Sequence, residues 1–315
     1  MILTVTPSPA IDKIYWIEKL NLEGEAPLTR ATRSYLSAGG KGINVSIFLA
    51  RMGIENVAMG FIAGETGRAL ERRVREENIT TSFIWAEGET RTNVTLLEKG
   101  REQRPIQISE AGPTVTPQAL RQFLAQYKRV VPRARYLFLG GTLPPGVPVL
   151  FYHELSQIAH QHGARVIINA AGEPLSLALS TQPWLVKPDM RYASQLDGYD
   201  LTDVDEIART GRDFVCARGI GALLVSHQIT HDILVTSEGI WDLEAHDVCF
   251  KNLLGAEDAL LAGLLSALVG GASLLEATRF GMAAATASAE SEELIVADRA
   301  QIEAVMSRIT VERLS

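Results

Sequence analysis

The chain has 315 residues, of which 46% are hydrophobic and 21% charged, so it can bury a sizeable core and suits one large α/β domain. Its formal net charge of -7 argues against a nucleic-acid-binding surface, which needs a basic face. The apolar run at residues 259–269 is too short to span a bilayer, and no charged leader precedes an apolar signal segment. We therefore expect a cytoplasmic protein that binds neither nucleic acid nor membrane.

Short apolar runs typical of β-strands alternate with helical patterns along most of the chain. These runs are residues 2–6, 57–62, 136–139, 166–169, 184–187 and 223–226. Gly53 marks a helix end, Thr116 precedes a proline as a helix N-cap, and residues 273–276 are typical of a capping box. This alternation predicts a mostly parallel sheet with helices on both faces.

Two stretches, at about residues 13–35 and 91–108, interrupt the alternation. Both have extended, period-two character without intervening helices, which predicts a small β-sheet appended to the main domain. Cys216 and Cys249 lie in apolar surroundings and offer no disulfide framework, so we expect both to be core residues in a reducing compartment.

Residues 255–258, Gly-Ala-Glu-Asp, precede a long apolar helix that we expect Asp258 to open. Unpaired backbone N–H groups near Gly255 and Ala256, together with the helix dipole, can hold a transferring phosphoryl group. Asp258 at the edge of this turn is placed to act as a general base toward an attacking hydroxyl.

Glu257 complicates this interpretation. If it points inward, it repels a neighbouring negative charge by about 4 kcal/mol at 4 Å in a partly screened site, and therefore opposes ATP. The structural alternative is that a carboxylate in the first turn stabilises the helix by about 0.3–1 kcal/mol. If the side chain rotates outward, phosphoryl transfer persists at a reduced rate.

Further motifs follow in a fixed order along nearly the whole chain. They are Thr-Pro-Ser-Pro-Ala-Ile-Asp at 6–12, Gly-Gly-Lys-Gly-Ile-Asn-Val at 39–45, Thr-Arg-Thr-Asn-Val at 90–94, Gly-Thr-Leu-Pro-Pro-Gly at 141–146 and Lys-Pro-Asp at 187–189. With the turn at 255–258, this series resembles the PfkB (ribokinase-like) carbohydrate kinases, especially bacterial 1-phosphofructokinases and tagatose-6-phosphate kinases. The resemblance implies one domain over residues 1–315, a three-layer αβα sandwich with a mostly parallel central sheet and a small β-sheet lid.

The resemblance also assigns the contacts to the sugar ring. Asp12 would hold sugar hydroxyls, and Asn44 would hydrogen-bond the ring. Gly39 and Gly40 would let the backbone approach the sugar closely. The alternative is a glycine turn that simply starts a helix and leaves the adjacent lysine on the surface.

The phosphate already on the sugar would meet cationic side chains. Lys41 and Arg91 would bind it, because Arg can make bidentate contacts with phosphate, and Asn93 would assist. Thr142 keeps a hydroxyl where the family has Ser-Gly-Ser-Leu-Pro, whereas Gly140 has lost one. These residues predict that a phosphorylated hexose binds beneath the lid.

The metal-organising motif of the family has changed. Lys-Pro-Asn-x-x-Glu is replaced by Lys-Pro-Asp-Met-Arg-Tyr at residues 187–192. Lys187 is retained, and Asp189 can still approach Mg²⁺ because hard cations prefer carboxylate oxygen. Tyr192 cannot replace the anionic group of the family's glutamate.

Two more nucleotide motifs have also changed. The segment that begins at Ser226 lacks both glycines of the family's Ser-x-Gly-x-x-Gly turn, which lets the backbone approach the nucleotide. Its two histidines, His227 and His231, have no evident third ligand, so we expect ordinary histidines rather than a metal site. Asn169 stands where the related kinases have the aspartate of Asp-x-Ser-Gly.

The sugar-binding residues are thus retained while the nucleotide-binding residues have changed. We predict a PfkB-fold protein that binds a hexose of the fructose 1-phosphate or tagatose 6-phosphate type, with ATP-dependent phosphoryl transfer weak or lost. Such a protein would act as a sugar-phosphate sensor or a partner of a true kinase, and as a homodimer through the lid.

Two alternatives remain open. The first is an active kinase with ATP and Mg²⁺ as cofactors, in which Asp258 is the base and Lys187 balances the transferring group. The second is a vestigial site with a structural or regulatory role.

Overall fold

The computed structural model of the chain describes residues 1–23, 27–101, 104–191, 194–228, 230–292 and 295–314. Within these ranges the main sheet contains ten strands, in the order β16-β15-β14-β13-β10-β9-β8-β1-β4-β5. They are β1 (Ile2–Thr6), β4 (Asn56–Ile62), β5 (Thr80–Trp85), β8 (Tyr136–Gly140), β9 (Arg165–Asn169), β10 (Leu185–Val186), β13 (Ala222–Gln228), β14 (His231–Thr236), β15 (Ile240–Ala245) and β16 (Ile309–Arg313). The pairs from β13 to β5 are parallel, and β14 to β16 continue the sheet antiparallel.

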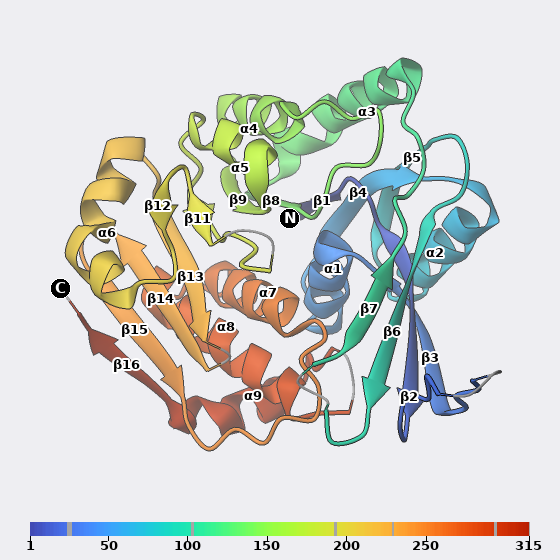
Figure 1. Cartoon of the computed structure of the whole chain (residues 1–315). Helices are drawn as coiled ribbons and strands as arrows, with labels where there is room; N and C mark the ends of the chain where they lie inside the picture. The colour runs from blue at the N-terminus through green and yellow to red at the C-terminus, as the bar shows by residue number, and fades with distance from the viewer. Residues whose placement is uncertain (24–26, 102–103, 192–193, 229, 293–294, 315) are drawn as a thin grey trace.

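Helices cover both faces of this sheet (Figure 1). They are α1 (Lys41–Arg51), α2 (Gly64–Glu76), α3 (Pro117–Val130), α4 (Phe151–Gln161), α5 (Gly172–Leu179), α6 (Val204–Arg218), α7 (Ala256–Val269), α8 (Leu274–Ala289) and α9 (Arg299–Val305), with 3₁₀ turns η1 (Val131–Arg133) and η2 (Met306–Arg308). None of the described helices combines the length and apolar character that a membrane span requires.

The two faces of the sheet bury two separate cores because alternate residues of a strand point to opposite sides. In β1, Leu3 and Val5 pack with residues of α3, α4, α5 and α6, whereas Ile2 packs with residues of α1, α7, α8 and α9. The result is the three-layer αβα sandwich that the sequence predicts.

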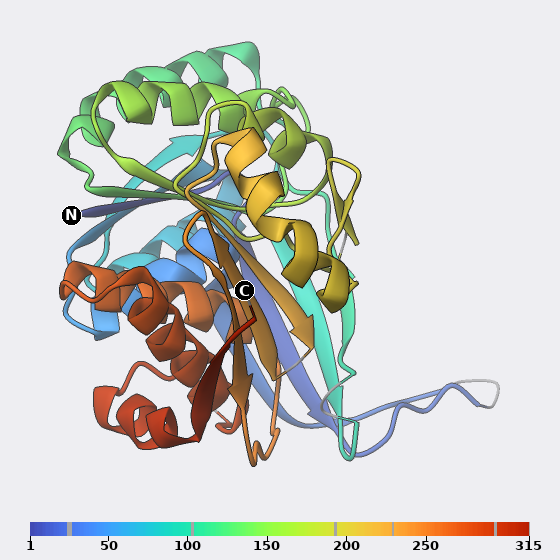
Figure 2. The ribbon, with the colours of Figure 1, turned by 90° about the vertical axis from the view of Figure 1, so that its left-hand side faces the viewer.

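A second sheet of four strands forms the lid, in the order β3-β2-β6-β7. Its strands are β2 (Ala10–Ile17), β3 (Ala31–Gly39), β6 (Arg91–Glu98) and β7 (Ile106–Ser109). Residues 18–23 and 27–30, which lie between β2 and β3, project away from the body of the molecule (Figure 2). The lid strands extend beyond the predicted segments, beginning at Ala10 and continuing to Gly39. A short hairpin, β11 (Gln195–Leu196) and β12 (Tyr199–Asp200), forms a third sheet.

The predicted helix ends are confirmed. Gly53 has a φ of 74° just after α1, Thr116 caps α3, and Ser273 forms a capping box with Glu276 at the start of α8. Helix α7 begins at Ala256 rather than at Asp258. Glu257 and Asp258 therefore both belong to the first turn of this helix.

The expectation that both cysteines lie in the core is wrong. Cys216 and Cys249 are exposed. Helix α6 buries Ile207, Gly211 and Val215 on one stripe, so the next residue, Cys216, points away from the sheet. Cys249 lies in the connection between β15 and α7, outside both cores.

Candidate active site

A cavity of about 1040 Å³ opens between the lid and the carboxyl ends of the central strands. Parallel α/β sheets bind ligands at this edge, where strands such as β1, β8 and β9 end together. The predicted site residues that line it are Asp12, Gly40, Lys41, Asn44, Arg91, Asn93, Thr142, Asp189, Gly255 and Asp258. The fold therefore gathers most of the predicted residues around one cavity.

The predicted sugar-binding residues of the lid hold one another in place. Asn93 of β6 donates to the Asp12 carboxylate of β2 at 2.8 Å, and it accepts a hydrogen bond from Ser109 at 2.7 Å. Burial raises the pKa of Asp12 to about 6, although the hydrogen bond from Asn93 and the charge of Arg91 oppose the shift. Asp12 is a strand residue paired with Asn93 in register, which fixes this contact.

Arg91 begins β6 and lines the cavity beside these residues. Its Nε donates to the carbonyl oxygen of Ser8 at 3.1 Å, and its Nη1 donates to Ser109 at 3.0 Å. These bonds orient the guanidinium, and Thr142, from the loop after β8, also lines the cavity.

The two glycines before α1 serve different purposes. Gly40 adopts a φ of 103° as the N-cap, a conformation that L side chains rarely adopt. A Cβ atom at Gly39 would collide with the carboxylate of Asp12. The pair therefore starts α1 close beneath the lid, and Gly39 itself does not line the cavity.

Asp258 lies at the floor of the cavity, in the first turn of α7. Its Oδ2 accepts a hydrogen bond from Asn44 of α1 at 2.7 Å, whereas its buried Oδ1 has no hydrogen-bond partner. Burial raises the pKa of Asp258, and Lys41 and Asn44 only partly offset the effect. The carboxylate is thus positioned and free to accept a proton through one oxygen.

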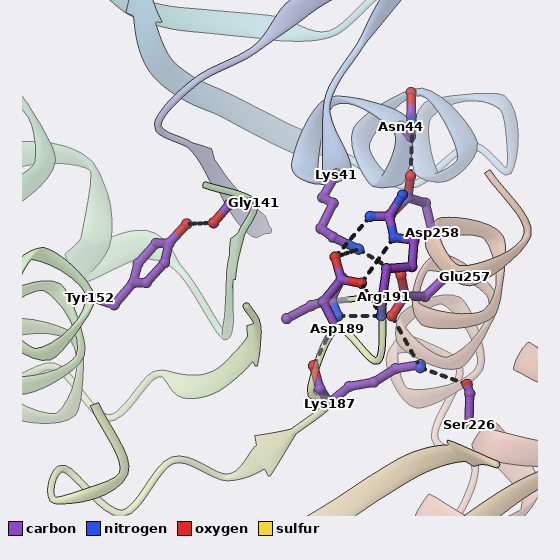
Figure 3. A network of polar contacts seen from close by, with 11 residues as sticks. Lys41, Asn44, Gly141, Tyr152, Lys187, Asp189, Arg191, Ser226, Glu257 and Asp258 are labelled. Atoms are coloured by element: carbon purple, nitrogen blue, oxygen red, sulfur yellow. Dashed lines mark hydrogen bonds and ion pairs between the residues drawn. The ribbon is translucent and has the colours of Figure 1, made fainter. Parts of the chain in front are cut away.

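Glu257 points inward, toward three donors from different elements (Figure 3). Its Oε2 lies 2.6 Å from Lys41 Nζ, while its Oε1 lies 3.2 Å from Lys187 Nζ and 3.1 Å from Asn169 Nδ2. Burial opposes ionisation of Glu257, but the attraction of Lys187 and Lys41 outweighs burial and lowers its pKa below the ordinary range. Glu257 is therefore a carboxylate held by two lysines.

Both lysines are deeply buried, with exposed fractions of 8% for Lys41 and 0% for Lys187. Lys187 also donates to Ser226 at 2.8 Å, and Ser226 donates to the buried Asp232 at 2.6 Å. The alternative that places Lys41 on the surface is wrong, because Glu257 and Asp189 draw its ammonium group inside.

The segment after Ser226 forms strand rather than an open turn. β13 runs to Gln228 and pairs with β14, with a register shift between Ser226 and Gln228. Of the described residues, none from this hairpin lines the cavity. Ile229 of the motif and Tyr192 of the metal-organising motif lie outside the described residues.

Arg191 is a site residue that sequence reasoning missed. It lines the cavity, and its guanidinium holds Asp189 through Nε at 2.9 Å and Nη2 at 2.8 Å (Figure 3). Burial opposes ionisation of Asp189, but Arg191 and Lys41 lower its pKa. Arg191 follows Asp189 by two residues in the sequence. It falls at a position that the family motif leaves unspecified, so the motif did not identify it.

The described parts of the chain contain no cluster of three or more His, Cys, Asp or Glu side chains arranged to hold a metal ion. His231 instead lies 3.4 Å from Glu244, its neighbour on β15. Asp189 is the carboxylate that the sequence placed nearest to Mg²⁺, and its oxygens face the two cations Arg191 and Lys41.

Comparisons with known proteins agree with this fold. The sequence profile of the pfkB family of carbohydrate kinases matches residues 9–299. The chain is 33% identical over 294 residues to 1-phosphofructokinase of Bacillus subtilis, covering 93% of this chain and 94% of that protein. It is 30% identical over 315 residues to D-tagatose-1-phosphate kinase of Bacillus licheniformis, covering 100% of each. The chain therefore belongs to the pfkB family of carbohydrate kinases.

Solved structures extend the comparison to the ribokinase-like fold. A possible 1-phosphofructokinase of Thermotoga maritima superposes with a TM-score of 0.92 at 32% identity, covering 100% of both chains. The tetrameric inhibited form of phosphofructokinase-2 from Escherichia coli gives a TM-score of 0.85 at 27% identity, covering 97% of this chain and 98% of that one. The predicted family and fold class are confirmed, and kinases of this family use ATP and a divalent metal.

Proposed function

We propose that this protein binds a phosphorylated ketohexose beneath its lid and that its ATP-dependent phosphoryl transfer is weak or lost. The observation that carries the proposal is the inward Glu257 carboxylate, which holds Lys41 at 2.6 Å and Lys187 at 3.2 Å. Both lysines are buried and contact Glu257 in the first turn of α7.

These contacts support a nucleotide-binding side that does not accept the terminal phosphate of ATP. A helix N-terminus with two nearby ammonium groups is an attractive place for an anion, and here the anion is part of the chain. A phosphate that entered would meet the Glu257 carboxylate, with a repulsion of about 4 kcal/mol for each pair of like charges at 4 Å.

Asn169 supports the same proposal. Its side-chain amide donates to Glu257 at 3.1 Å and to the carbonyl oxygen of Lys187 at 2.9 Å. An aspartate at this position, as in the related kinases, would place a second carboxylate against Glu257. Asn169 therefore suits a site in which Glu257 stays inward.

The acceptor side retains the groups that a sugar phosphate needs. Asp12 and Asn93 form a hydrogen-bonded pair for hydroxyl groups, and Arg91 supplies a cation at the same wall of the cavity. The names of the two Bacillus relatives both point to a ketohexose with its phosphate at position 1. We therefore propose fructose 1-phosphate or tagatose 1-phosphate as the first ligands to test, with the 6-phosphates as comparison.

An active kinase is the second candidate, and the geometry of Asp258 favours it. Asn44 orients Asp258, which lines the cavity, and its buried Oδ1 has no hydrogen-bond partner and can accept a proton, as a general base requires. Under this alternative, Glu257 must leave both lysines whenever ATP binds.

Two calorimetric titrations and a turnover assay separate the candidates. We expect fructose 1-phosphate to bind and a nonhydrolysable ATP analogue with Mg²⁺ to bind at least about tenfold more weakly than the sugar phosphate. ADP release from fructose 1-phosphate, ATP and Mg²⁺ at a rate usual for kinases, on the order of 1–100 per second, would overturn the proposal. Absence of binding by every sugar phosphate tested would favour a vestigial site.

A homodimer through the lid is a further part of the proposal. Large apolar side chains of the lid are exposed, namely Tyr35 of β3 and Ile106 and Ile108 of β7. A neighbour in the structure comparison is described as a tetramer, which supports assembly in this family without fixing the state of this chain.

A further inference from the structure

Arg191 and Asp189 form an ion pair at the cavity wall that plays no part in the proposed exclusion of phosphate by Glu257. Arg191 donates to both carboxylate oxygens of Asp189, and its backbone N–H donates to Oδ1 at 3.2 Å. Asp189 is only 2% exposed. A bidentate guanidinium on a buried carboxylate is among the strong charge-assisted hydrogen-bond arrangements in proteins.

Asp189 has its remaining charge partner in Lys41, whose Nζ lies 3.2 Å from Oδ2. Both oxygens of this carboxylate therefore face cations that belong to the chain. A divalent metal ion at Asp189 would have to displace Arg191, or else sit beside two positive charges that repel it.

The ion pairs around Asp189 are made within the chain, without any added ion. Lys41, Lys187 and Arg191 contact the two acids Asp189 and Glu257 in an unbroken set of ion pairs, and the buried Asp232 and Asp258 interact electrostatically with the lysines. A metal ion would add two further positive charges beside these three cations.

We propose that Arg191 takes the place of a divalent metal ion in this site, as the permanent counter-ion of Asp189, so that the sugar-phosphate pocket is ordered and binds its ligand without metal. The proposal rests on the proposed function for the identity of the ligand. It goes beyond that function because Glu257 concerns only the site of the nucleotide phosphate, whereas Arg191 concerns the site of the metal ion.

Loss of Arg191 changes the charge of the cavity wall. Without Arg191, Asp189 keeps one cation, Lys41, and presents excess negative charge toward a phosphorylated ligand. A divalent ion can then bind Asp189, since Mg²⁺ and Mn²⁺ prefer carboxylate oxygen. An arginine that merely contacted the ligand's phosphate would not be replaceable in this way.

The test is a cation rescue of ligand binding. Fructose 1-phosphate is titrated into the wild type, Arg191→Ala and Arg191→Lys, each with a chelator and then with millimolar Mg²⁺ or Mn²⁺. We expect the wild type to bind equally well in both conditions. Arg191→Ala should bind at least about tenfold more weakly with chelator and recover with either metal, because the variant loses a hydrogen-bonded charge pair that a metal ion can replace. Arg191→Lys, which keeps the charge, should respond little to metal.

Three results would overturn the inference. One is a wild type whose affinity falls on chelation; another is an Arg191→Ala variant as tight as the wild type with chelator; the third is weakened binding that neither metal restores. Thermal unfolding shows whether each variant is folded. If Arg191→Ala does not fold, ligand binding by the wild type with chelator still tests whether the pocket needs a metal ion.

A separate readout distinguishes failure of this inference from failure of the proposed function. If the wild type binds no sugar phosphate, the proposed function fails, and electron paramagnetic resonance of added Mn²⁺ still tests Arg191. We expect no Mn²⁺ binding by the wild type and binding by Arg191→Ala that the further change Asp189→Asn abolishes. Mn²⁺ bound by the wild type through Asp189, or none bound by folded Arg191→Ala, would contradict the inference.

Discussion

Asp12 gives the sugar side of the cavity a dependence on pH. Burial raises the pKa of its carboxyl group to about 6, above the value of an unfolded chain, so the folded protein takes up this proton first. Stability that comes from the protonated group is therefore present at low pH and lost as pH rises through about 6. The ionised carboxylate, which accepts hydrogen bonds from sugar hydroxyls, dominates above that pH.

We predict that the affinity for fructose 1-phosphate rises between pH 5 and pH 7, with a midpoint near the Asp12 pKa of about 6. The ligand's own phosphate also titrates at about pH 6, so Asp12→Asn serves as the matched control in calorimetry. The variant should bind more weakly and keep only the phosphate's share of the pH dependence. Identical pH profiles for both proteins would rule out the assigned role of Asp12.

Asp258 is predicted to trade stability for chemistry. Its pKa is raised by burial and its Oδ1 lacks a partner, so its charged form costs stability at neutral pH. Asp258→Asn should raise the melting temperature, change fructose 1-phosphate affinity by less than about threefold, and abolish any residual ADP release. A lower melting temperature, or turnover that survives the change, would contradict this account.

Single residues also show what the sequence could and could not predict about the site. The motifs placed Asp12, Asn93 and Asp258 correctly around one cavity because each belongs to a short pattern at an element's end. The direction of Glu257 depends on Lys41 and Lys187, which lie 216 and 70 positions away in the chain. No local pattern encodes such a convergence.

Helix α7 and the elements around its N-terminus form one electrostatic unit. Glu257 of α7 bridges Lys41 at the start of α1 and Lys187 at the end of β10. Removal of one partner from a buried ion pair typically costs about 3–5 kcal/mol because the remaining charge is uncompensated. Glu257 therefore stabilises the junction of three elements, in addition to its proposed exclusion of phosphate.

We predict that Glu257→Ala lowers the free energy of unfolding by about 3 kcal/mol. Inorganic phosphate should raise the melting temperature of this variant more than that of the wild type, since an anion that binds only the folded state stabilises it. Glu257→Gln, which keeps the shape but not the charge, should lie between the two. Equal stabilisation of wild type and variant by phosphate in thermal unfolding would show that Glu257 does not occupy an anion site.

At the level of elements, the alternating pattern predicted the parallel part of the sheet, except for the edge strand β5, and both lid segments. It did not single out the antiparallel extension from β14 to β16. Strand β15 mixes buried with half-buried residues and β16 is mostly exposed, so both lack the continuous apolar runs that mark the central strands. The apolar surroundings of Cys216 in the sequence likewise predict a core position, but the residue lies on the exposed face of α6.

In the proposed function, the whole molecule combines a sugar-phosphate pocket with a nucleotide side that Glu257 of the chain fills. Its proposed assembly is tested most simply at the lid, where Ile108 of β7 is 61% exposed. We predict a homodimer by light scattering and a monomer for Ile108→Lys, with Val269→Lys, an equally apolar exposed residue on α7, as the matched control. A monomeric wild type, or equal loss of dimer in both variants, would exclude the lid as the interface.

The measurement that tests the central claim most directly is the binding of a nonhydrolysable ATP analogue to Glu257→Gly, compared with the wild type. Glu173→Gly provides the control, because Glu173 is also a first-turn acid, on α5, and is exposed. We predict that Glu257→Gly binds the analogue at least about tenfold more tightly than the other two proteins, because Lys41 and Lys187 are released to meet its terminal phosphate. Tight binding of the analogue by the wild type, unchanged in Glu257→Gly, would contradict the account.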